Sequence, residues 1–444
     1  MSTAYIYRDP TSSTGVQKAT FSFWCKRNKL TAGQYIFFNG FQSNYGSYNF
    51  YIKWHSDDTI KIINDDGGVN FKIVTNRLFR DPNAWYHVYL ALDLTQSGTD
   101  RGKLYINGVR ETSFSSETTM SGDQFLTGKT GYRSFINRSP NATSEMGGYC
   151  LSHCYYIDGY IVDVGQFGST DTSTGEWKIN TSPTIANYGT NGFLIFKDDK
   201  TITDQSSGSN DWTLAQGTLT KTEDCPSNVF ATFNANNTYF VGGTGSNGNT
   251  TWQTNNSQYS SIDTTLGASS GKYYWEFKCS ARTSGDYWHI GIKSAQDTAS
   301  SHHLGYYATD YAYQSYNGNR QNNNTGVSYG ATYTIGDIIG VAMDLDNNRL
   351  FFSKNGTWQD SGDPTSSTGA ITITDPASTP FGFYIPAFSF NDGSGNGTIQ
   401  ANFGNGYFGS TQISSAGTNA SGNGIFEYDV PTGFTALSTK GLNL

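Results

Sequence analysis

The chain has 444 residues, of which 51 are Gly, 30 Tyr, 28 Phe and 9 Trp, and only 14% are charged. Its formal net charge of −8 leaves no basic face that could neutralise phosphates, which argues against a nucleic-acid partner. No apolar stretch approaches the roughly 20 residues of a membrane-spanning helix, so membrane insertion is not expected either.

Length and composition together predict the fold class. A single hydrophobic core seldom supports so long a chain, so two domains of roughly 200 residues each are the natural division. Aromatic residues suit the half-buried surface of a sheet, and abundant Gly, Asn, Asp and Ser supply turns. No long run places apolar residues at helical spacing. We therefore expect an all-β protein made of two antiparallel β-sandwiches in tandem.

The first half of the chain contains a complete predicted meander. The segment WYHVYLALDL (85–94) is expected to form a strand, TQSGTDRG (95–102) a loop, and KLYI (103–106) the returning strand. Asn107 and Gly108 then favour a type I′ turn, because such a turn needs positive φ at both central residues.

A passage rich in Ser, Asp, Thr and Gly separates the two predicted domains. We assign residues 1–197 to the first sandwich, 198–225 to an ordered connecting segment and 226–444 to the second sandwich. Trp212 lies within the connecting segment. Because so large an apolar side chain is seldom left exposed, we expect Trp212 to pack the segment against one sandwich.

The second half repeats the meander. In GDIIGVAMDL (336–345), heavy apolar residues alternate with small or polar ones, which is the period of a strand. DNN (346–348) is expected to turn the chain, RLFFS (349–353) to return it, and Asn355 with Gly356 to form a second type I′ turn. Two such meanders, far apart in one chain, predict two sandwiches of the same general architecture.

The candidate binding site is an unusual concentration of aromatic residues in the second half. Tyrosine combines a large rigid apolar face with a hydroxyl group, and such side chains stack on sugars or anchor protein partners. The candidate ligand-binding residues are Trp288, Tyr306, Tyr307, Tyr311, Tyr313 and Tyr316. The alternation of Tyr311 and Tyr313 also fits the core face of one strand, so that alternative stays open.

No motif in the chain predicts catalysis. The G-x-S-x-G pattern around Ser269 is followed by the strand-like KYYWEFK, whereas a nucleophile elbow needs a helix there. No two Glu residues lie two positions apart in the sequence, which removes the simplest arrangement of a retaining glycosidase. The acidic pairs at 57–58 and 65–66 are interpreted as hairpin turns, with calcium binding as the alternative. We expect no enzymatic activity, no catalytic residue, no metal site and no cofactor.

The second half resembles a SPRY domain over nearly its whole length. Five segments stand in the order typical of that family: GKYYWEFKCSA (271–281), HIGIKSA (289–295), GDIIGVAMDLDNNRLFFSKNG (336–356), FYIPAFSF (383–390) and IQANFG (399–404). The resemblance implies that loops at one end of the sandwich form a recognition surface. The tyrosine-rich loop, with Trp288 at its base, is the candidate for it.

The first half resembles a laminin-G or concanavalin-like jelly roll. The similar segments are TFSFWCKR (20–27), WYHVYLALDL (85–94) and GKLYINGVRE (102–111). The combination of the two folds also resembles tailed-bacteriophage proteins described as tail-fibre-like. That resemblance lies in the joining segments IDGYIVDVGQFG (157–168), YGTNGFLIF (188–196), DQSSGSNDWTL (204–214) and CPSNVFATFNA (225–235).

The resemblance to phage proteins implies a structural and adhesive function in the virion. The protein would pack on other phage virion proteins, and its loops would bind a glycan or protein of the host surface. It would do so either as a homo-oligomer or as a single chain. It would fold in the host cytoplasm, which fits an odd number of cysteines, five, that cannot all pair. Head decoration and, less favoured, glycan hydrolysis are the alternatives.

Overall fold

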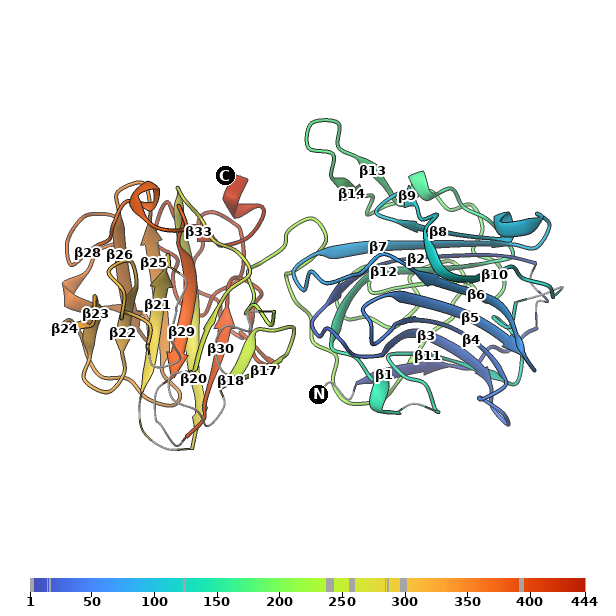
Figure 1. Ribbon diagram of the computed structural model, residues 1–444, viewed down its shortest axis with the longest axis horizontal. Coiled ribbons are helices and arrows are strands. Elements are labelled where there is room, and N and C mark those ends of the chain that lie inside the picture. Colours follow the sequence, from blue (N-terminus) through green and yellow to red (C-terminus); the bar gives the residue numbers. More distant parts are fainter. Residues whose placement is uncertain are drawn as a thin grey trace. The chain divides into compact units, whose positions relative to one another are not determined.

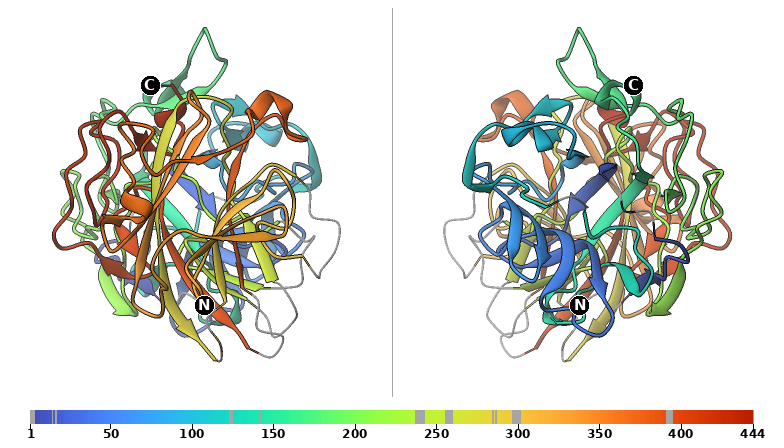
Figure 2. Two further views of the ribbon diagram at one scale, coloured as in Figure 1. Left: turned by 90° about the vertical axis from the view of Figure 1, so that its left-hand side faces the viewer. Right: turned by 90° about the vertical axis from the view of Figure 1, so that its right-hand side faces the viewer.

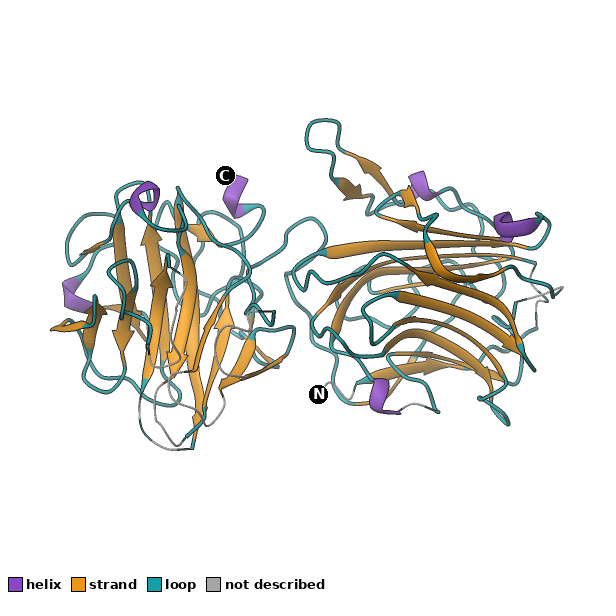
Figure 3. Cartoon of the chain, viewed as in Figure 1, coloured by secondary structure: helices purple, strands orange, loops and turns teal. Residues whose placement is uncertain are grey.

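The structure is a computed structural model of the chain. It describes all residues except 1–3, 14, 16, 123–124, 142, 237–242, 255–259, 284, 286, 296–301, 391–394 and 444. The chain divides into two compact units, Met1–Lys221 and Thr222–Leu444 (Figure 1). The described residues form strands, turns and short 3-10 helices, without an α-helix (Figure 3). The prediction of an all-β chain with two antiparallel sandwiches is confirmed.

The first unit is a sandwich of two antiparallel sheets. One contains β1 (Tyr5–Arg8), β3 (Gln34–Phe41), β4 (Tyr48–Trp54), β5 (Ile60–Asp66), β6 (Val69–Thr75), β10 (Phe114–Thr118), β11 (Tyr132–Ile136) and β16 (Thr213–Gln216). The order in this eight-stranded sheet is β10-β6-β5-β4-β3-β11-β1-β16. The other sheet contains β2 (Lys18–Arg27), β7 (Trp85–Asp93), β8 (Gly102–Ile106), β9 (Val109–Arg110), β12 (Tyr149–Asp158) and β15 (Phe193–Ile195). Its order is β15-β12-β2-β7-β8-β9.

Smaller elements complete the first unit. A separate hairpin pairs β13 (Gly168–Thr170) with β14 (Trp177–Ile179). The 3-10 helices are η1 (Gly98–Arg101), η2 (Thr143–Glu145) and η3 (Val164–Gln166). None of the helices in the described parts of the chain is long and apolar enough to cross a bilayer.

Alternating side chains of both sheets fill the core of the first unit. In β2, Ala19, Phe21, Phe23 and Cys25 point into this core and are at most 4% exposed. Phe21 stacks on Phe50 of the opposite sheet, with ring centroids 5.4 Å apart. Every second residue of the strand therefore contributes to one core, as the period of a strand requires.

The predicted connecting segment packs on the first unit. Trp212 is 5% exposed, and its ring centroid lies 5.0 Å from that of Phe193 in β15. The next residues form β16, which pairs with β1 at the edge of the eight-stranded sheet. The expectation that Trp212 packs the segment against one sandwich is confirmed, and the division between the units falls after Lys221.

A buried polar network fixes the same segment. The guanidinium group of Arg8 donates to the backbone carbonyl of Asn191 and to the side chain of Asn210. The Asp204 carboxylate accepts a hydrogen bond from the Asn210 amide at 2.7 Å. These buried polar groups satisfy one another, which gives two of the joining segments of the sequence, 188–196 and 204–214, a structural role.

The β13–β14 hairpin stands out from the first unit in every view (Figure 1 and Figure 2). Trp177 fixes its base, because the indole Nε1 donates to His87 Nδ1 at 3.0 Å and the two rings stack. The Trp177 ring also lies directly against Gly108 in the predicted type I′ turn. That turn is confirmed, since φ is 49° at Asn107 and 74° at Gly108.

Replacing Gly108 with alanine is expected to destabilise the first unit by about 2–3 kcal/mol, because a left-handed backbone and a steric clash add together. The added Cβ would lie 2.3 Å from the Trp177 ring. Gly98→Ala is the matched control, since Gly98 also has positive φ (59°) but nothing within 4 Å of the added Cβ. Equal losses of thermal stability in the two variants would contradict the role assigned to the Trp177 contact.

The second unit is also a sandwich of two sheets. The larger contains β17 (Gly243–Ser246), β18 (Thr251–Thr254), β20 (Lys272–Arg282), β25 (Ile338–Asp344), β26 (Arg349–Lys354), β27 (Thr357–Trp358), β28 (Ile371–Thr372), β30 (Gly397–Asn402) and β33 (Thr435–Ala436). Its order is β17-β18-β30-β20-β25-β26-β27, with β28 on β26 and β33 parallel to β20. The smaller contains β19 (Ser260–Asp263), β21 (Trp288–Lys293), β22 (Tyr311–Gln314), β23 (Asn319–Asn322), β24 (Thr325–Ser328) and β29 (Ile385–Phe390). Its order is β19-β29-β21-β22-β23-β24.

The remaining elements of the second unit are short. They are the hairpin of β31 (Tyr407–Phe408) and β32 (Thr411–Gln412), and the 3-10 helices η4 (Gln359–Ser361), η5 (Pro376–Ser378) and η6 (Gly441–Asn443). The second predicted meander is confirmed as β25, β26 and β27, joined at its second turn by Asn355 and Gly356 with φ of 49° and 79°. Ile339, Val341 and Met343 of β25 lie in the core with no exposed surface.

Candidate functional site

The six predicted binding residues do not form one surface. Trp288, at the start of β21, is completely buried, and Tyr311 and Tyr313 of β22 are 6% and 0% exposed. The Tyr313 ring packs 4.9 Å from that of Tyr333, whose hydroxyl donates to the carbonyl of Tyr313. The structure corrects the prediction for these three residues, because their side chains fill the core. The alternative interpretation of Tyr311 and Tyr313 as one core face agrees with the structure.

Tyr306 and Tyr307 lie half-buried in a loop that covers the outer face of the smaller sheet. The His302 ring stacks on Tyr306 with centroids 3.6 Å apart, and His302 Nδ1 is hydrogen-bonded to the Tyr307 hydroxyl at 2.8 Å. The amide of Leu304 donates to Ser389 Oγ on β29. The Leu304 hydrogen bond holds the loop against the sheet, and the contacts with His302 bury part of each tyrosine ring.

Two further histidines, His303 in this loop and His289 in β21, contact each other. The ring of His303 meets that of His289 edge-on at 4.7 Å. Burial lowers the pKa of His289 to about 3 and also lowers the pKa of His303, so both rings are neutral near pH 7. Within the described ranges, no three His, Cys, Asp or Glu side chains are grouped so that they could hold a metal ion.

The exposed aromatic surface lies at one end of the second sandwich. Tyr316, just beyond β22, is 48% exposed, and Tyr287, just before β21, is 36% exposed. Their ring centroids are 5.3 Å apart. The guanidinium group of Arg282, at the end of β20, lies 5.7 Å from the Trp288 ring centroid. Ile335, in the loop before β25 at the same end, is 47% exposed. We call Tyr287, Tyr316 and Ile335 the loop-end surface.

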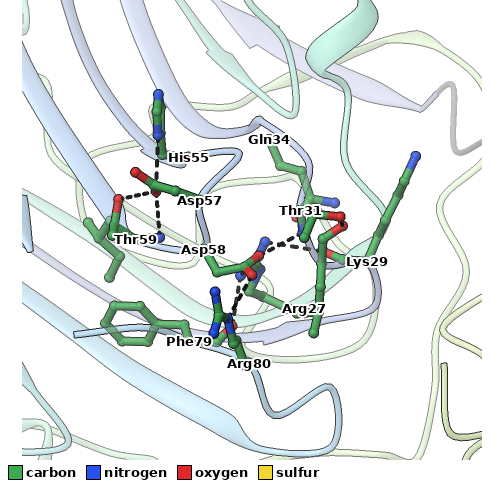
Figure 4. A network of polar contacts seen from close by, with 12 residues as sticks. Arg27, Lys29, Thr31, Gln34, His55, Asp57, Asp58, Thr59, Phe79 and Arg80 are labelled. Atoms are coloured by element: carbon green, nitrogen blue, oxygen red, sulfur yellow. Dashed lines mark hydrogen bonds and ion pairs between the residues drawn. The ribbon is translucent and has the colours of Figure 1, made fainter. Parts of the chain in front are cut away.

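Asp57 and Asp58, one of the two acidic pairs for which calcium binding was the alternative, form hydrogen bonds with other groups of the protein (Figure 4). Asp58 is 1% exposed, and its carboxylate accepts hydrogen bonds from Arg27, the Thr31 amide and Arg80. The Asp57 carboxylate accepts from the amide and hydroxyl of Thr59. Asp58 is therefore a buried partner of two guanidinium groups and not a solvated turn residue, which sequence reasoning missed.

Ser22 and His87 are hydrogen-bonded in the first unit, but the histidine is not arranged to activate the serine as a nucleophile. Ser22 Oγ lies 2.9 Å from His87 Nε2, while His87 Nδ1 accepts the hydrogen bond of Trp177. A neutral imidazole that accepts at Nδ1 carries its proton on Nε2, so Nε2 donates to Ser22. Burial lowers the pKa of His87 to about 3, which keeps it neutral. His87 thus has no lone pair directed at Ser22 with which to remove a proton.

Glu276 of β20 is a fully buried carboxylate that holds the C-terminal segment of the second unit. Its oxygens accept hydrogen bonds from the amides of Glu427 and Tyr428 at 2.9 and 2.8 Å, from the Asn402 side chain at 3.0 Å and from the Tyr274 hydroxyl at 3.1 Å. Burial outweighs these bonds and raises the pKa of Glu276 to about 7. We interpret this group as structural because all four contacts lie within the domain.

The chain is a protein of two β-sandwich domains, and comparison with known families assigns each domain. Residues 272–406 match the SPRY domain family, and residues 2–148 match the Concanavalin A-like lectin/glucanases superfamily. SPRY domains mediate protein–protein interactions, so a protein partner fits the chain in general terms.

The sequence similarity to relatives with curated descriptions extends over a short part of the chain. Ran-binding protein 9 of Danio rerio is 37% identical over 90 residues, which are 20% of this chain and 15% of that protein. Human Ran-binding protein 9 is also 37% identical over 90 residues, 20% of this chain and 12% of its own length. Among solved structures, the SPRY domain of human HERC1 is 17% identical and covers 36% of this chain and 91% of its own, with a TM-score of 0.28.

The comparisons correct the predicted function. The relatives are Ran-binding proteins of animals, including the Drosophila melanogaster homolog of Ran-binding proteins 9 and 10, which is 33% identical over 90 residues. The prediction of a phage tail-fibre-like virion protein, with head decoration as its alternative, is therefore wrong. The predicted phage partners and the predicted virion location depended on the same resemblance. The chain spans about 15% or less of the length of these relatives.

Proposed function

We propose that this chain is a binding protein without catalytic activity, and that its SPRY domain recognises a protein partner through the loop-end surface. The observation that carries the proposal is the exposure of Tyr287, Tyr316 and Ile335 at one end of the sandwich. Three large apolar side chains gathered in this way are typical of an interaction site. Tyrosine is also enriched among the residues that dominate binding energy in interfaces.

The residues next to the loop-end surface are held in place by packing and hydrogen bonds. Trp288 below it is completely buried, and the Arg282 guanidinium stacks on that indole. The hydroxyl of Tyr333 ties the carbonyls of Trp288 and Tyr313 together, at 3.1 and 2.6 Å. A partner would meet tyrosine rings whose base is already ordered, so little conformational entropy is lost on binding. The relatives are named for binding Ran, and for this chain the proposal extends to a protein partner as a class.

Selection of peptides from a surface-displayed random library on the full chain tests the proposal. Enriched peptides are expected to bind the double variant Tyr287→Ala/Tyr316→Ala at least about tenfold more weakly, because buried aromatic anchors typically contribute most of such an interface. Binding is measured by titration with a labelled peptide.

Phe383→Ala is the matched control for this experiment. Phe383 is 38% exposed and stacks on Phe381 with centroids 5.6 Å apart, but it precedes β29 at the opposite end of the sandwich. Its removal is expected to leave peptide affinity unchanged. Peptides that bind the double variant as tightly as the natural chain, or that lose affinity only with Phe383→Ala, would place the site elsewhere.

A further inference from the structure

The smaller sheet of the second unit ends in an open edge strand. β24 is the last strand in the order of this sheet, and among the described strands it pairs with β23 alone (Figure 1). All four of its residues, Thr325–Ser328, are exposed, and Val327 is 46% exposed. The outer side of β24 therefore presents backbone groups that no other strand in the described part of the chain covers.

The turn of the β23–β24 hairpin determines which backbone groups face outward. Asn323 and Asn324 form a two-residue turn with φ of 50° and 53°, as a type I′ turn requires. The residues that flank such a turn exchange both backbone hydrogen bonds, and this pattern repeats at every second residue. The pattern directs the amide and carbonyl of Val327 to β23. It directs those of Gly326 and Ser328 away from the sheet.

β24 lacks the features by which proteins usually prevent edge-to-edge pairing. Its sequence, TGVS, contains no charged residue and no proline, and its register with β23 runs without a shift. Edge strands of the first unit differ from it, because β10 carries Glu117 and a register shift and β9 carries Arg110. The edge of β24 is therefore open to the addition of a further strand.

The outward groups of β24 are complementary to those of a second copy of the same strand. When two β24 strands run antiparallel about a two-fold axis at Val327, Gly326 of each copy lies opposite Ser328 of the other. Each such pair exchanges both hydrogen bonds, so every outward amide and carbonyl of the two strands finds a partner. The two Val327 side chains then face each other directly across the axis and cover their exposed surface.

A second copy also fits this edge better than a flexible peptide does. Ordering the backbone of a free peptide costs about as much free energy per residue as a backbone hydrogen bond returns. A second copy brings a strand that β23 has already ordered, so this loss of entropy is avoided. The nearest charge permits the approach. Arg320 lies opposite Val327 in β23, so at normal strand spacing it is on the order of 14 Å from its counterpart, beyond the Debye length of about 8 Å.

We propose that two copies of this chain associate through β24, which joins their smaller sheets into one continuous antiparallel sheet. Each copy uses the same edge, so the two-fold arrangement is closed and the assembly stops at a dimer. So short an edge buries less surface than a standard interface. We therefore expect a weak dimer with a Kd on the order of 100 µM.

Sedimentation equilibrium of the full chain tests the proposal in about 0.15 M salt, which screens the net charge of −8. We expect a monomer–dimer equilibrium. Val327→Lys and Val327→Glu each place like charges opposite one another and should weaken the dimer at least about tenfold. An equimolar mixture of these two variants pairs opposite charges, so it should form dimers again and show that both variants are folded.

Two matched controls accompany these variants. Val109→Lys adds the same charge to a valine of the edge strand β9 that is 63% exposed, and it should leave the Kd unchanged. Ser328→Pro removes an outward amide from each copy and should weaken the dimer about tenfold, whereas Ser328→Ala keeps that amide and should not.

Several results would overturn the proposal. A natural chain that stays monomeric up to about 500 µM would do so, as would species larger than a dimer. Failure of the mixed lysine and glutamate variants to associate would exclude pairing at Val327. Equal weakening by Val109→Lys and Val327→Lys would place the contact outside β24.

Discussion

Replacing Asp58 with asparagine is expected to destabilise the first unit by about 3–5 kcal/mol, because removing one partner of a buried ion pair leaves the other charge uncompensated. The other charge is Arg27, whose side chain has no exposed surface. Arg27 also donates to the carbonyls of Phe79 and Lys29 at 2.7 and 3.2 Å and lies 5.1 Å over the Trp54 ring, so it cannot turn toward solvent. Asparagine keeps the left-handed backbone that Asp58 adopts (φ 68°), which separates the lost charge from backbone strain.

Asp57→Asn is the matched control at the neighbouring position. The Asp57 side chain is 56% exposed, and its hydrogen bonds with Thr59 lie within one turn. We expect a loss of about 1 kcal/mol, since an asparagine oxygen can accept the same bonds. Calorimetry of the full chain measures both variants, and the transition that Asp58→Asn and Gly108→Ala both lower is assigned to the first unit. Similar losses for the two variants, or a shift of the second unit's transition with Asp58→Asn, would contradict the assignment.

The turns and the strand period of this chain could be predicted because they depend on neighbouring residues. Asn107 with Gly108 and Asn355 with Gly356 both adopt the positive φ values that a type I′ turn requires. Trp212 was predicted to pack because its size alone makes exposure unfavourable, and it does pack on Phe193. In each case the physical cause lies within a few residues of the sequence.

The positions of the functional side chains could not be predicted in the same way. Period-two alternation says that Tyr311 and Tyr313 share a face, but the core and a binding surface have the same alternation, and the structure places both in the core. The Arg27–Asp58–Arg80 contacts bring together strand β2 and two loops that lie far apart in the sequence. Such packing is a tertiary property, so the spacing of these residues in the sequence carried no signal for it.

In the second unit, Glu276→Ala is expected to destabilise the domain by about 3–5 kcal/mol, since buried donors without an acceptor cost about 1–3 kcal/mol each. The donors left without an acceptor are the amides of Glu427 and Tyr428 and the side chain of Asn402. Glu427→Ala is the matched control. The Glu427 side chain is partly exposed and only its backbone takes part in the contact, so its loss should stay within about 0.5 kcal/mol.

The pH dependence of the free energy of unfolding tests whether burial controls the protonation of Glu276. Its pKa in the folded chain is about 7, above the ordinary value of 4.5, so the folded state holds the proton more tightly than the unfolded state does. The contribution of Glu276 to stability is therefore greatest below about pH 4.5 and falls as the pH rises to about 7. Glu276→Gln has the shape of the protonated acid and does not titrate. The difference in the free energy of unfolding, natural chain minus Glu276→Gln, should shrink between pH 5 and pH 8 in urea titrations. A difference that grows over this interval would mean that the four hydrogen bonds outweigh burial and hold the group ionised.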